Sequence, residues 1–186
     1  MIGTRPLTDQ ELVDINQTLS CLRDKALFTL GYCSGFRISE LLSLKVQDVF
    51  QHGKVVERIT VQRKHMKKQT SGRTVLLHPK AVSALSSYLN QTSLDPSDPL
   101  FLSAKGGGAI SRIQAWRIYK AAFQRLKLGG KLGTHSTRKT FADKMYKALD
   151  KDLIRTQRAL GHANVNSTVS YLSFNETEID EALLSL

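Results

Sequence analysis

The chain has 186 residues, 41% of them hydrophobic, which suits one globular domain with a sizeable core. It has no run near the roughly 20 consecutive apolar residues of a membrane span and no basic start followed by an apolar stretch, which argues against a membrane protein and a secretory signal. The formal net charge of +11 and the pI of about 9.8 favour an anionic partner, either nucleic acid or an anionic membrane surface.

Three helices are predicted before residue 45. Thr8-Asp-Gln-Glu11 is a capping box, which predicts that a helix begins there. The apolar pattern from Leu22 to Cys33 indicates a second, buried helix, and Gly35 interrupts it. Residues 37–44 have the pattern of a short third helix. The predicted inward residues of the first and third helices are Leu12, Ile15, Leu19, Ile38, Leu41 and Leu42.

The pattern then changes to the two-residue period of β-strands. Val55, Ile59 and Val61 lie in one β-rich run, and residues 74–77 form another. The segment between them, residues 63–72, is polar, basic and ends in glycine, so we expect an exposed hairpin turn. The sequence therefore predicts a small antiparallel sheet near residues 54–77.

Helical patterns return after the hairpin. Pro79 suits the first turn of one helix, and Ser111 can cap another that runs through Leu126. Further helices are expected near residues 137–149, 152–160, 166–172 and 176–186. No repeat, low-complexity tract or change in composition divides the chain. We therefore predict a mostly α-helical fold with a small antiparallel β-sheet (α+β), as one domain over residues 1–186.

The two cysteines, Cys21 and Cys33, lie in or near the apolar helical patterns. Without a secretory signal, they are expected to be buried free thiols in a reducing compartment. The sequence has no C-x-x-C pair and no close Cys/His cluster, so we expect neither a metal site nor a cofactor.

The positive charge is concentrated in one part of the chain. Residues 105–158 contain fourteen Lys or Arg and three acids, a net charge equal to that of the whole chain. Residues 175–186 contain four acids and no base. A solubilising basic surface is one interpretation, but this segregation favours an electrostatic footprint for nucleic acid.

Two places in the sequence could hold a phosphate. Arg37 follows a Gly turn at a helix start, where a rigidly held guanidinium suits bidentate phosphate capture. The alternative is a surface pair between Arg37 and Glu40. His135 and Arg138 are three residues apart near a helix start, so their side chains share a face and could converge on one phosphate. The H-x-x-R pattern alone is also common by chance.

Three further features could carry chemistry. His162 follows Gly161 at a predicted helix end, where it could project from a fixed turn or interact with the helix dipole. Tyr171 lies nine residues later and could be a nucleophile or a core or interface residue. The hairpin tip could grip a DNA backbone without doing chemistry. Its lysines are Lys64, Lys67 and Lys68.

Taken in order, these residues resemble the catalytic domain of the tyrosine recombinase (phage integrase) family. The strings GFRISELLSL, THSTRKTFA and LGHANVNSTVSYL carry the resemblance, which spans nearly the whole chain. It implies the fold of that catalytic domain, with Glu40 supporting the neighbouring Arg37. Lys68 is the alternative to Lys67, because the turn length varies in the family. The residues to which the resemblance gives catalytic roles are Arg37, Lys67, His135, Arg138, His162 and Tyr171.

The resemblance also implies a reaction and partners. Tyr171 would attack a DNA phosphodiester and form a covalent 3′-phosphotyrosine, while the arginines and histidines hold the charged oxygens in place of a metal ion. His135 is expected to be the base, and the hairpin lysine the general acid for the leaving 5′ oxygen. The implied partners are double-stranded DNA and further copies of the chain, as a tetramer on DNA, in the cytoplasm of a bacterium or phage-infected host at the nucleoid.

Two other functions share some of these features. A type IB topoisomerase would use the same chemistry to relax supercoils, but the Gly-His-Ala sequence and the acidic tail favour a recombinase. A non-catalytic DNA-binding module derived from a recombinase is the second, and the intact set of Arg, His and Tyr residues argues against it.

The ends of the chain raise two further expectations. Family members carry a separate helical domain before this one, but the first helix predicted here begins near Thr8. We therefore expect that domain to be absent, in an excised fragment or a naturally short protein, and DNA binding by this chain alone to be weak. Residues 176–186 predict an acidic helix with one apolar stripe. That helix would fold back on its own domain or, as the resemblance suggests, dock on a neighbouring protomer.

Overall fold

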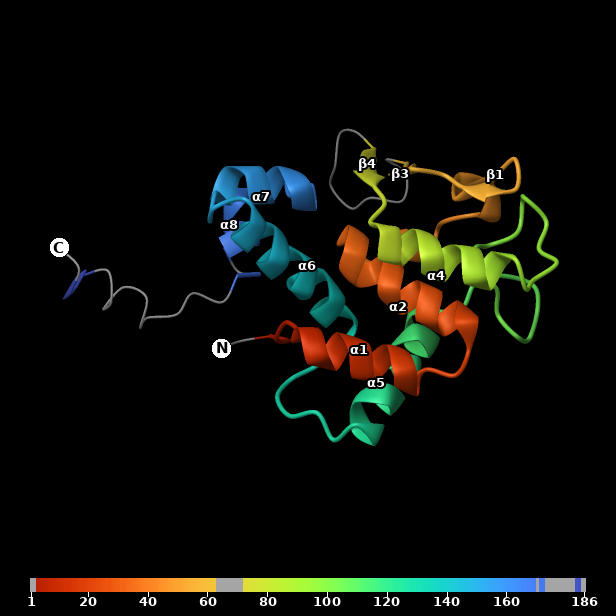
Figure 1. Ribbon diagram of the computed structural model, residues 1–186, viewed down its shortest axis with the longest axis horizontal. Coiled ribbons are helices and arrows are strands. Elements are labelled where there is room, and N and C mark those ends of the chain that lie inside the picture. The colour runs from red at the N-terminus through yellow and green to blue at the C-terminus, as the bar shows by residue number, and fades with distance from the viewer. Residues whose placement is uncertain (1–2, 63–71, 170, 173–182, 185–186) are drawn as a thin grey trace. The chain divides into compact units, whose positions relative to one another are not determined.

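The computed structural model describes residues 3–62, 72–169, 171–172 and 183–184. The chain divides into two compact units, Met1–Phe141 and Ala142–Leu186, and each is described by itself. Helices dominate both units (Figure 1). No helix in the described ranges is long and apolar enough to cross a membrane.

The first unit begins with the predicted capped helix. Helix α1 (Asp9–Thr18) starts at Thr8, whose hydroxyl accepts a hydrogen bond from the Glu11 backbone N–H, while the Glu11 carboxylate accepts one from the Thr8 N–H. Arg5 donates to both Glu11 carboxylate oxygens at 2.5 and 2.8 Å. The predicted capping box is confirmed, and the ion pair with Arg5 fixes the orientation of its acid.

Helix α2 (Leu22–Ser34) forms the centre of this unit. Most of its residues are buried, as the continuous apolar pattern predicts, and it lies beside helix α4 (Pro79–Leu89) (Figure 1). Pro79 occupies the first turn of α4, as predicted. The two cysteines are free, but Cys21 is exposed and Cys33 only partly buried. The prediction that both thiols are buried is therefore wrong for Cys21, because it is the residue that caps α2 at the surface.

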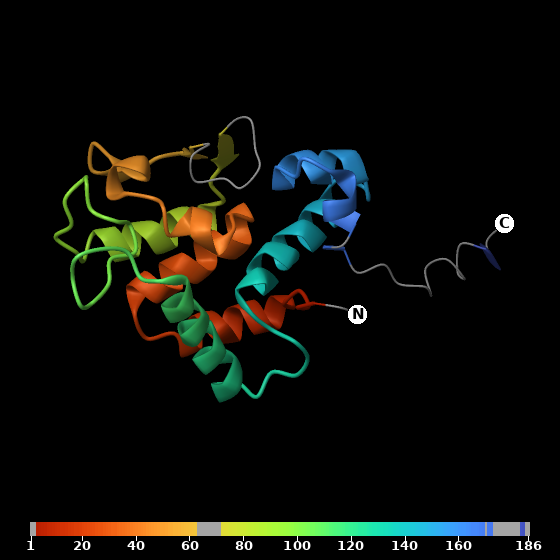
Figure 2. The ribbon, with the colours of Figure 1, turned by 180° about the vertical axis from the view of Figure 1, so that it is seen from behind.

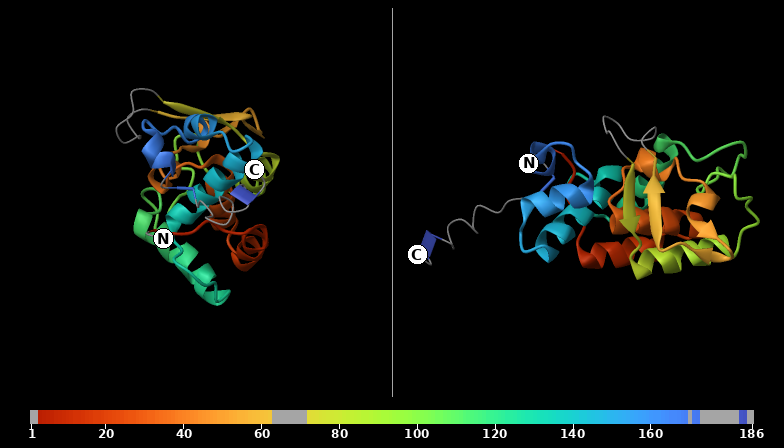
Figure 3. Two further views of the ribbon diagram at one scale, coloured as in Figure 1. Left: turned by 90° about the vertical axis from the view of Figure 1, so that its left-hand side faces the viewer. Right: turned by 90° about the horizontal axis from the view of Figure 1, so that it is seen from above.

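Short elements follow α2. Helix α3 (Ile38–Leu41) and the 3-10 helix η1 (Val46–Asp48) lead into two antiparallel strand pairs. Strand β1 (Phe50–Gln51) pairs with β2 (Lys54–Val55), and β3 (Arg58–Val61) pairs with β4 (Arg73–Leu76). Figure 3 shows β3 and β4 as neighbouring arrows in its right-hand view. The small antiparallel sheet is confirmed, and the turn predicted over residues 63–72 lies almost entirely outside the described residues.

Helix α5 (Arg112–Arg125) also belongs to the first unit and lies against α1 (Figure 2). Ser111 caps it, as predicted, by accepting a hydrogen bond from the Gln114 N–H. Two of its apolar side chains, Ile113 and Trp116, are exposed at 61% and 42%. The buried residues of the helix are Ala115, Tyr119, Ala122 and Phe123.

Helix α6 (Thr134–Ala148) begins in the first unit and continues into the second. It starts three residues earlier than predicted, which places His135 in its first turn. The second unit also contains helices α7 (Leu153–Leu160) and α8 (Val165–Val169), which contact each other. The tail helix predicted over residues 176–186 lies outside the described residues except for positions 183 and 184.

Candidate active site

A glycine turn at the end of α2 organises the candidate residues of the first unit. Gly35 has a φ of +62°, and a Cβ added to it would overlap the ring of Phe141. Both the left-handed backbone and this close approach therefore require glycine. The turn continues through Phe36, which is 1% exposed, and delivers Arg37 at the start of α3.

Arg37 is paired with Glu40 three residues later, as one interpretation of the sequence proposed. Its backbone N–H donates to Glu40 Oε2 at 2.7 Å, and its Nη1 donates to Oε1 at 2.8 Å. The Glu40 side chain is 1% exposed, whereas that of Arg37 is 29% exposed. A guanidinium carries five N–H donors, so this pairing fixes Arg37 and leaves donors for a phosphate.

Arg138 reaches the same carboxylate from α6. Its Nη1 donates to the Gly35 carbonyl oxygen and lies 3.8 Å from Glu40 Oε2. Two guanidiniums from distant parts of the chain thus share one buried acid, which leaves an excess of positive charge. The Arg138 side chain is 1% exposed, so contact with a phosphate requires a local rearrangement around it.

His135 lies one helical turn before Arg138. The residue reaches the surface, but its ring is partly desolvated, and this desolvation lowers its pKa below 6.5. The positive charges of Arg138, Arg37 and Lys139 lower the pKa further. The imidazole is therefore neutral at pH 7, the form that can accept a proton.

The second unit brings His162 and Tyr171 together. Gly161 ends α7 in the left-handed conformation, and His162 follows with only 7% of its surface exposed. Its Nδ1 lies 2.9 Å from the Thr168 hydroxyl oxygen in α8. The His162 and Tyr171 rings meet edge to face, with centroids 5.1 Å apart and planes at 62°.

The sequence-predicted residues therefore form two groups. Arg37, His135 and Arg138 gather in the first unit, and His162 and Tyr171 in the second. Lys67 and its alternative Lys68 lie outside the described residues. Sequence reasoning missed Arg73, which is buried beside the arginines, and Thr168. Thr168 could have been found from its place three residues before Tyr171 on a predicted helix.

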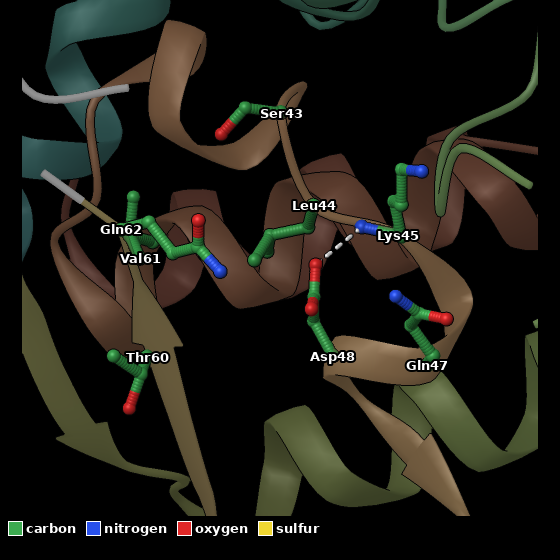
Figure 4. A pocket seen from close by; sticks show the side chains of 8 residues that line it. All are labelled: Ser43, Leu44, Lys45, Gln47, Asp48, Thr60, Val61 and Gln62. Carbon is green, nitrogen blue, oxygen red and sulfur yellow. Dashed lines mark hydrogen bonds between the residues drawn. The ribbon is translucent and has the colours of Figure 1, made fainter. Parts of the chain in front are cut away.

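A small pocket lies between the segment that follows α3, the helix η1 and the end of β3, with a volume of about 140 Å³ (Figure 4). Asp48 Oδ2 accepts a hydrogen bond from the Lys45 backbone N–H at 2.8 Å, so this carboxylate closes the turn. None of the five predicted site residues that the structure describes lines the pocket. Across the part of the chain that the structure describes, no three His, Cys, Asp or Glu side chains gather as potential metal ligands.

Comparison with known proteins identifies relatives of the chain. The phage integrase family matches residues 5–178. The tyrosine recombinase XerC of Herpetosiphon aurantiacus is 33% identical over 168 residues, which cover 87% of this chain and 52% of the relative. The "Probable integrase/recombinase YoeC" of Bacillus subtilis is 32% identical over 154 residues, covering 83% of this chain and 79% of the relative. The chain spans about half the length of most curated relatives that it matches.

Solved structures show the same fold. The XerA recombinase superposes with a TM-score of 0.80 at 25% identity, covering all of this chain and 64% of the other. The XerH recombinase in a post-cleavage complex with its palindromic difH substrate gives a TM-score of 0.73 at 27% identity, covering 97% and 52%. The predicted fold class and family are confirmed. The solved structures that resemble this chain are tyrosine recombinases, and the chain belongs to the phage integrase family.

Proposed function

We propose that the chain is the DNA-cleaving part of a site-specific recombinase or integrase that works through a covalent 3′-phosphotyrosine. Given that the chain belongs to this family, one observation carries the proposal. Arg37 and Arg138 converge on the buried Glu40 carboxylate, beside a histidine whose lowered pKa keeps it neutral. This arrangement supports binding of a negatively charged phosphodiester at Arg37, with a proton acceptor next to it.

The proposed chemistry begins with Tyr171. Its hydroxyl oxygen attacks phosphorus, the Tyr Oη–P bond forms, and the bond from phosphorus to the 5′ oxygen breaks. The phenol proton passes to His135, and the leaving 5′ oxygen takes a proton from the hairpin lysine, Lys67 or alternatively Lys68. The products are a 3′-phosphotyrosyl end and a free 5′-hydroxyl. A second DNA 5′-hydroxyl reverses the step, because the phosphodiester energy is kept in the covalent bond.

The arginines supply the electrostatic part of this step. A pentavalent phosphorus carries extra charge on its non-bridging oxygens, and fixed donors aimed there lower the barrier without reorganising. Glu40 holds Arg37 through two hydrogen bonds, which supports such fixed placement. His162, close to Tyr171, would add a further donor at the phosphate. The two compact units would then act as one catalytic domain over residues 1–186.

Double-stranded DNA is the proposed partner. The basic segment 105–158 supplies the charge, and relatives with the same fold have been solved on DNA, among them XerH with difH and a lambda integrase dimer on a COC′ core site. We further propose self-association as a tetramer on DNA, with the acidic tail 176–186 docking on a neighbouring protomer. Such an enzyme would act in the bacterial cytoplasm, at the nucleoid.

The test is covalent capture on a library of duplexes that combine a random central sequence with a nick near its middle. The nick lets the short 5′-hydroxyl fragment diffuse away and traps the 3′-phosphotyrosine, so protein–DNA adducts survive denaturing electrophoresis. Sequencing the trapped DNA identifies the preferred site. Absence of adducts with the wild-type chain on every duplex would contradict the proposal and favour a non-catalytic DNA-binding module.

Strand exchange separates the two enzyme classes. On the captured site, a recombinase transfers its 3′ end to the 5′-hydroxyl of a second duplex. A protein that forms adducts and relaxes supercoiled plasmid, but never joins two duplexes, would be a type IB topoisomerase.

A further inference from the structure

Arg73, the first residue of β4, is a buried arginine that the mechanism above does not use. It is 7% exposed, and its guanidinium donates hydrogen bonds to two backbone carbonyls at the end of α2. Nη2 donates to Ser34 O at 2.7 Å and Nη1 to Gly35 O at 3.3 Å. The side chain therefore ties the start of a strand to the turn that delivers Arg37.

Two aromatic rings hold the guanidinium in place. Its central carbon lies 5.0 Å from the centroid of the Phe36 ring and 5.8 Å from that of Phe141. Both rings belong to the same turn region, because Phe36 follows Gly35 and Phe141 packs against it. A guanidinium placed against aromatic faces is attracted by the ring quadrupole and loses its freedom to reorient.

The backbone of Arg73 is also fixed. Residue 73 pairs with Val61 across the sheet, and a Cβ added to Gly72 would lie 2.9 Å from Val61 O. The chain thus enters β4 at a close approach that only glycine allows. Because the strand fixes one end of the Arg73 side chain and the rings fix the other, its hydrogen bonds restrict where the Ser34 and Gly35 carbonyls can lie.

That carbonyl is shared with a candidate catalytic residue. Gly35 O accepts a hydrogen bond from Arg138 as well as from Arg73. Burial and the charge of Arg138 lower the pKa of Arg73 to about 9, while Glu40 opposes this shift. Arg73 is therefore still charged at pH 7, although it lies near two other arginines.

We propose that Arg73 is a positioning residue for DNA cleavage, which holds the Gly35 turn so that Arg37 and Arg138 face the same phosphate. This inference rests on the proposed function. It assigns a role to a buried residue that acts through two others, Arg37 and Arg138. A purely structural anchor would contribute to folding in the same way, so the test needs a measurement that reports on the arginine pair.

The first variant is Arg73→Lys, which keeps the charge but lacks the planar fork that reaches two carbonyls. Arg58→Lys is the matched control, since Arg58 is an exposed arginine on the facing strand β3. Adduct formation is followed in single turnover on the captured site, with DNA affinity measured in parallel. We expect Arg73→Lys to slow cleavage by about 10²-fold, as a misplacement near 1 Å does, with affinity nearly unchanged. Arg58→Lys should behave as wild type.

A change in the substrate separates positioning from folding. Replacing one non-bridging oxygen of the cleaved phosphate by methyl removes the negative charge that the arginines stabilise. The defect of Arg73→Lys should then shrink to roughly tenfold or less, because less stabilisation remains to be lost. On a substrate whose 5′ leaving oxygen is replaced by sulfur, the defect should stay at its full size, since the arginines do not supply the leaving-group proton.

A double-mutant cycle gives the second criterion. Because Arg73 and Arg138 share Gly35 O, Arg73→Lys should cost much less in an Arg138→Ala background than in wild type. If Arg73→Lys does not fold, as judged by thermal unfolding, Phe141→Leu replaces it. That variant removes one ring and keeps Arg73, and we expect a smaller defect with the same dependence on the methyl-substituted substrate.

The outcomes separate this inference from the proposed function. If wild type forms no adduct, the proposed function fails and the inference fails with it. If wild type is active, three results each overturn the inference alone: cleavage by Arg73→Lys at the wild-type rate, equal defects on the charged and methyl-substituted substrates, or rescue by the sulfur substrate. The last result would mean that Arg73 acts through the hairpin lysine.

Discussion

Arg138 and Tyr171 lie in different compact units and differ in how the fold holds them. Arg138 is almost completely buried, and its partners Gly35 and Glu40 are themselves fixed by a glycine turn and a second arginine. Tyr171 follows the five-residue helix α8, keeps part of its surface exposed and meets the ring of His162. In the proposed reaction, this contrast separates a firmly held arginine pair from a nucleophile carried on a short element. Arg37 of that pair is open to a phosphate, and Arg138 becomes so after a local rearrangement.

The physical reason for such a division is clear. Charged donors lower a barrier when they are oriented before the reaction, which requires rigid partners. A nucleophile must line up with the leaving oxygen, and moving it turns cleavage on or off without disturbing the charges. The comparison therefore predicts that changes in the first unit alter the rate of the chemical step, and that changes in the second alter the placement of Tyr171.

The largest effect is expected from Tyr171→Phe. Removing the hydroxyl removes the proposed nucleophile, so covalent adducts should disappear while DNA affinity stays nearly unchanged. Adducts are counted by denaturing electrophoresis and affinity by a filter or gel-shift assay. Tyr146→Phe is the matched control, since Tyr146 is another partly exposed tyrosine of the second unit. Adducts formed by the Tyr171→Phe variant would show that another residue attacks the phosphate.

The next effect concerns the arginine pair. Arg37→Ala and Arg138→Ala should each slow adduct formation by roughly 10²–10³-fold, the loss typical of one oxyanion donor. Glu40 keeps one arginine partner in either variant, so both should fold, which thermal unfolding checks. A rate close to wild type in either variant would mean that this arginine has only a structural role, namely its ion pair with Glu40.

A smaller effect is expected in the second unit. Thr168→Val keeps the shape of the side chain but removes the hydroxyl that lies 2.9 Å from His162 Nδ1. A hydrogen bond is worth about 1 kcal/mol, so the rate should fall by about five- to tenfold if His162 orients Tyr171. Thr168→Ser restores the hydroxyl and should restore the rate. Equal defects in the Val and Ser variants would point to packing of α8 instead.

Much of the fold could be predicted from local sequence signals. The capping box at Thr8, the proline at position 79 and the serine cap at 111 each stand where a helix begins. The predicted start of α6 was three residues late, because the helix begins at Thr134 and the residue before it, Gly133, has no side chain that could signal a cap. The exposed Ile113 and Trp116 were also beyond prediction, since a helical apolar pattern does not show what covers it.

The candidate site, too, could be predicted from the sequence only in part. The Arg37–Glu40 pair follows from their spacing of three, but no local rule shows that Arg138 shares the Gly35 carbonyl, because that contact joins distant parts of the chain. Arg73 had a usable signal: it lies two residues before Val75, so strand alternation turns both to the same side. The helix end at Gly161 could be predicted, but the meeting of His162 with Tyr171 also depends on how α8 packs against α7, which sequence periodicity does not describe.

The smallest expected effect is a shift in pH dependence, and it separates the two units most directly. Desolvation and the charges of Arg138, Arg37 and Lys139 lower the pKa of His135 below 6.5. The neutral imidazole accepts the proton. We therefore expect kcat/KM to be constant at pH values above this pKa and to fall as the pH drops through it, with a midpoint below 6.5. Removing a nearby positive charge makes protonation easier, so Arg138→Ala and Arg37→Ala should each move the midpoint upward, Arg138→Ala the more. Thr168→Ser, a change in the second unit, should leave the midpoint in place.

The profile is measured as the rate of adduct formation at subsaturating DNA between pH 5 and 8, a range that brackets the ordinary titration of histidine. A midpoint that ignores both arginine variants would mean that His135 is not the group being titrated.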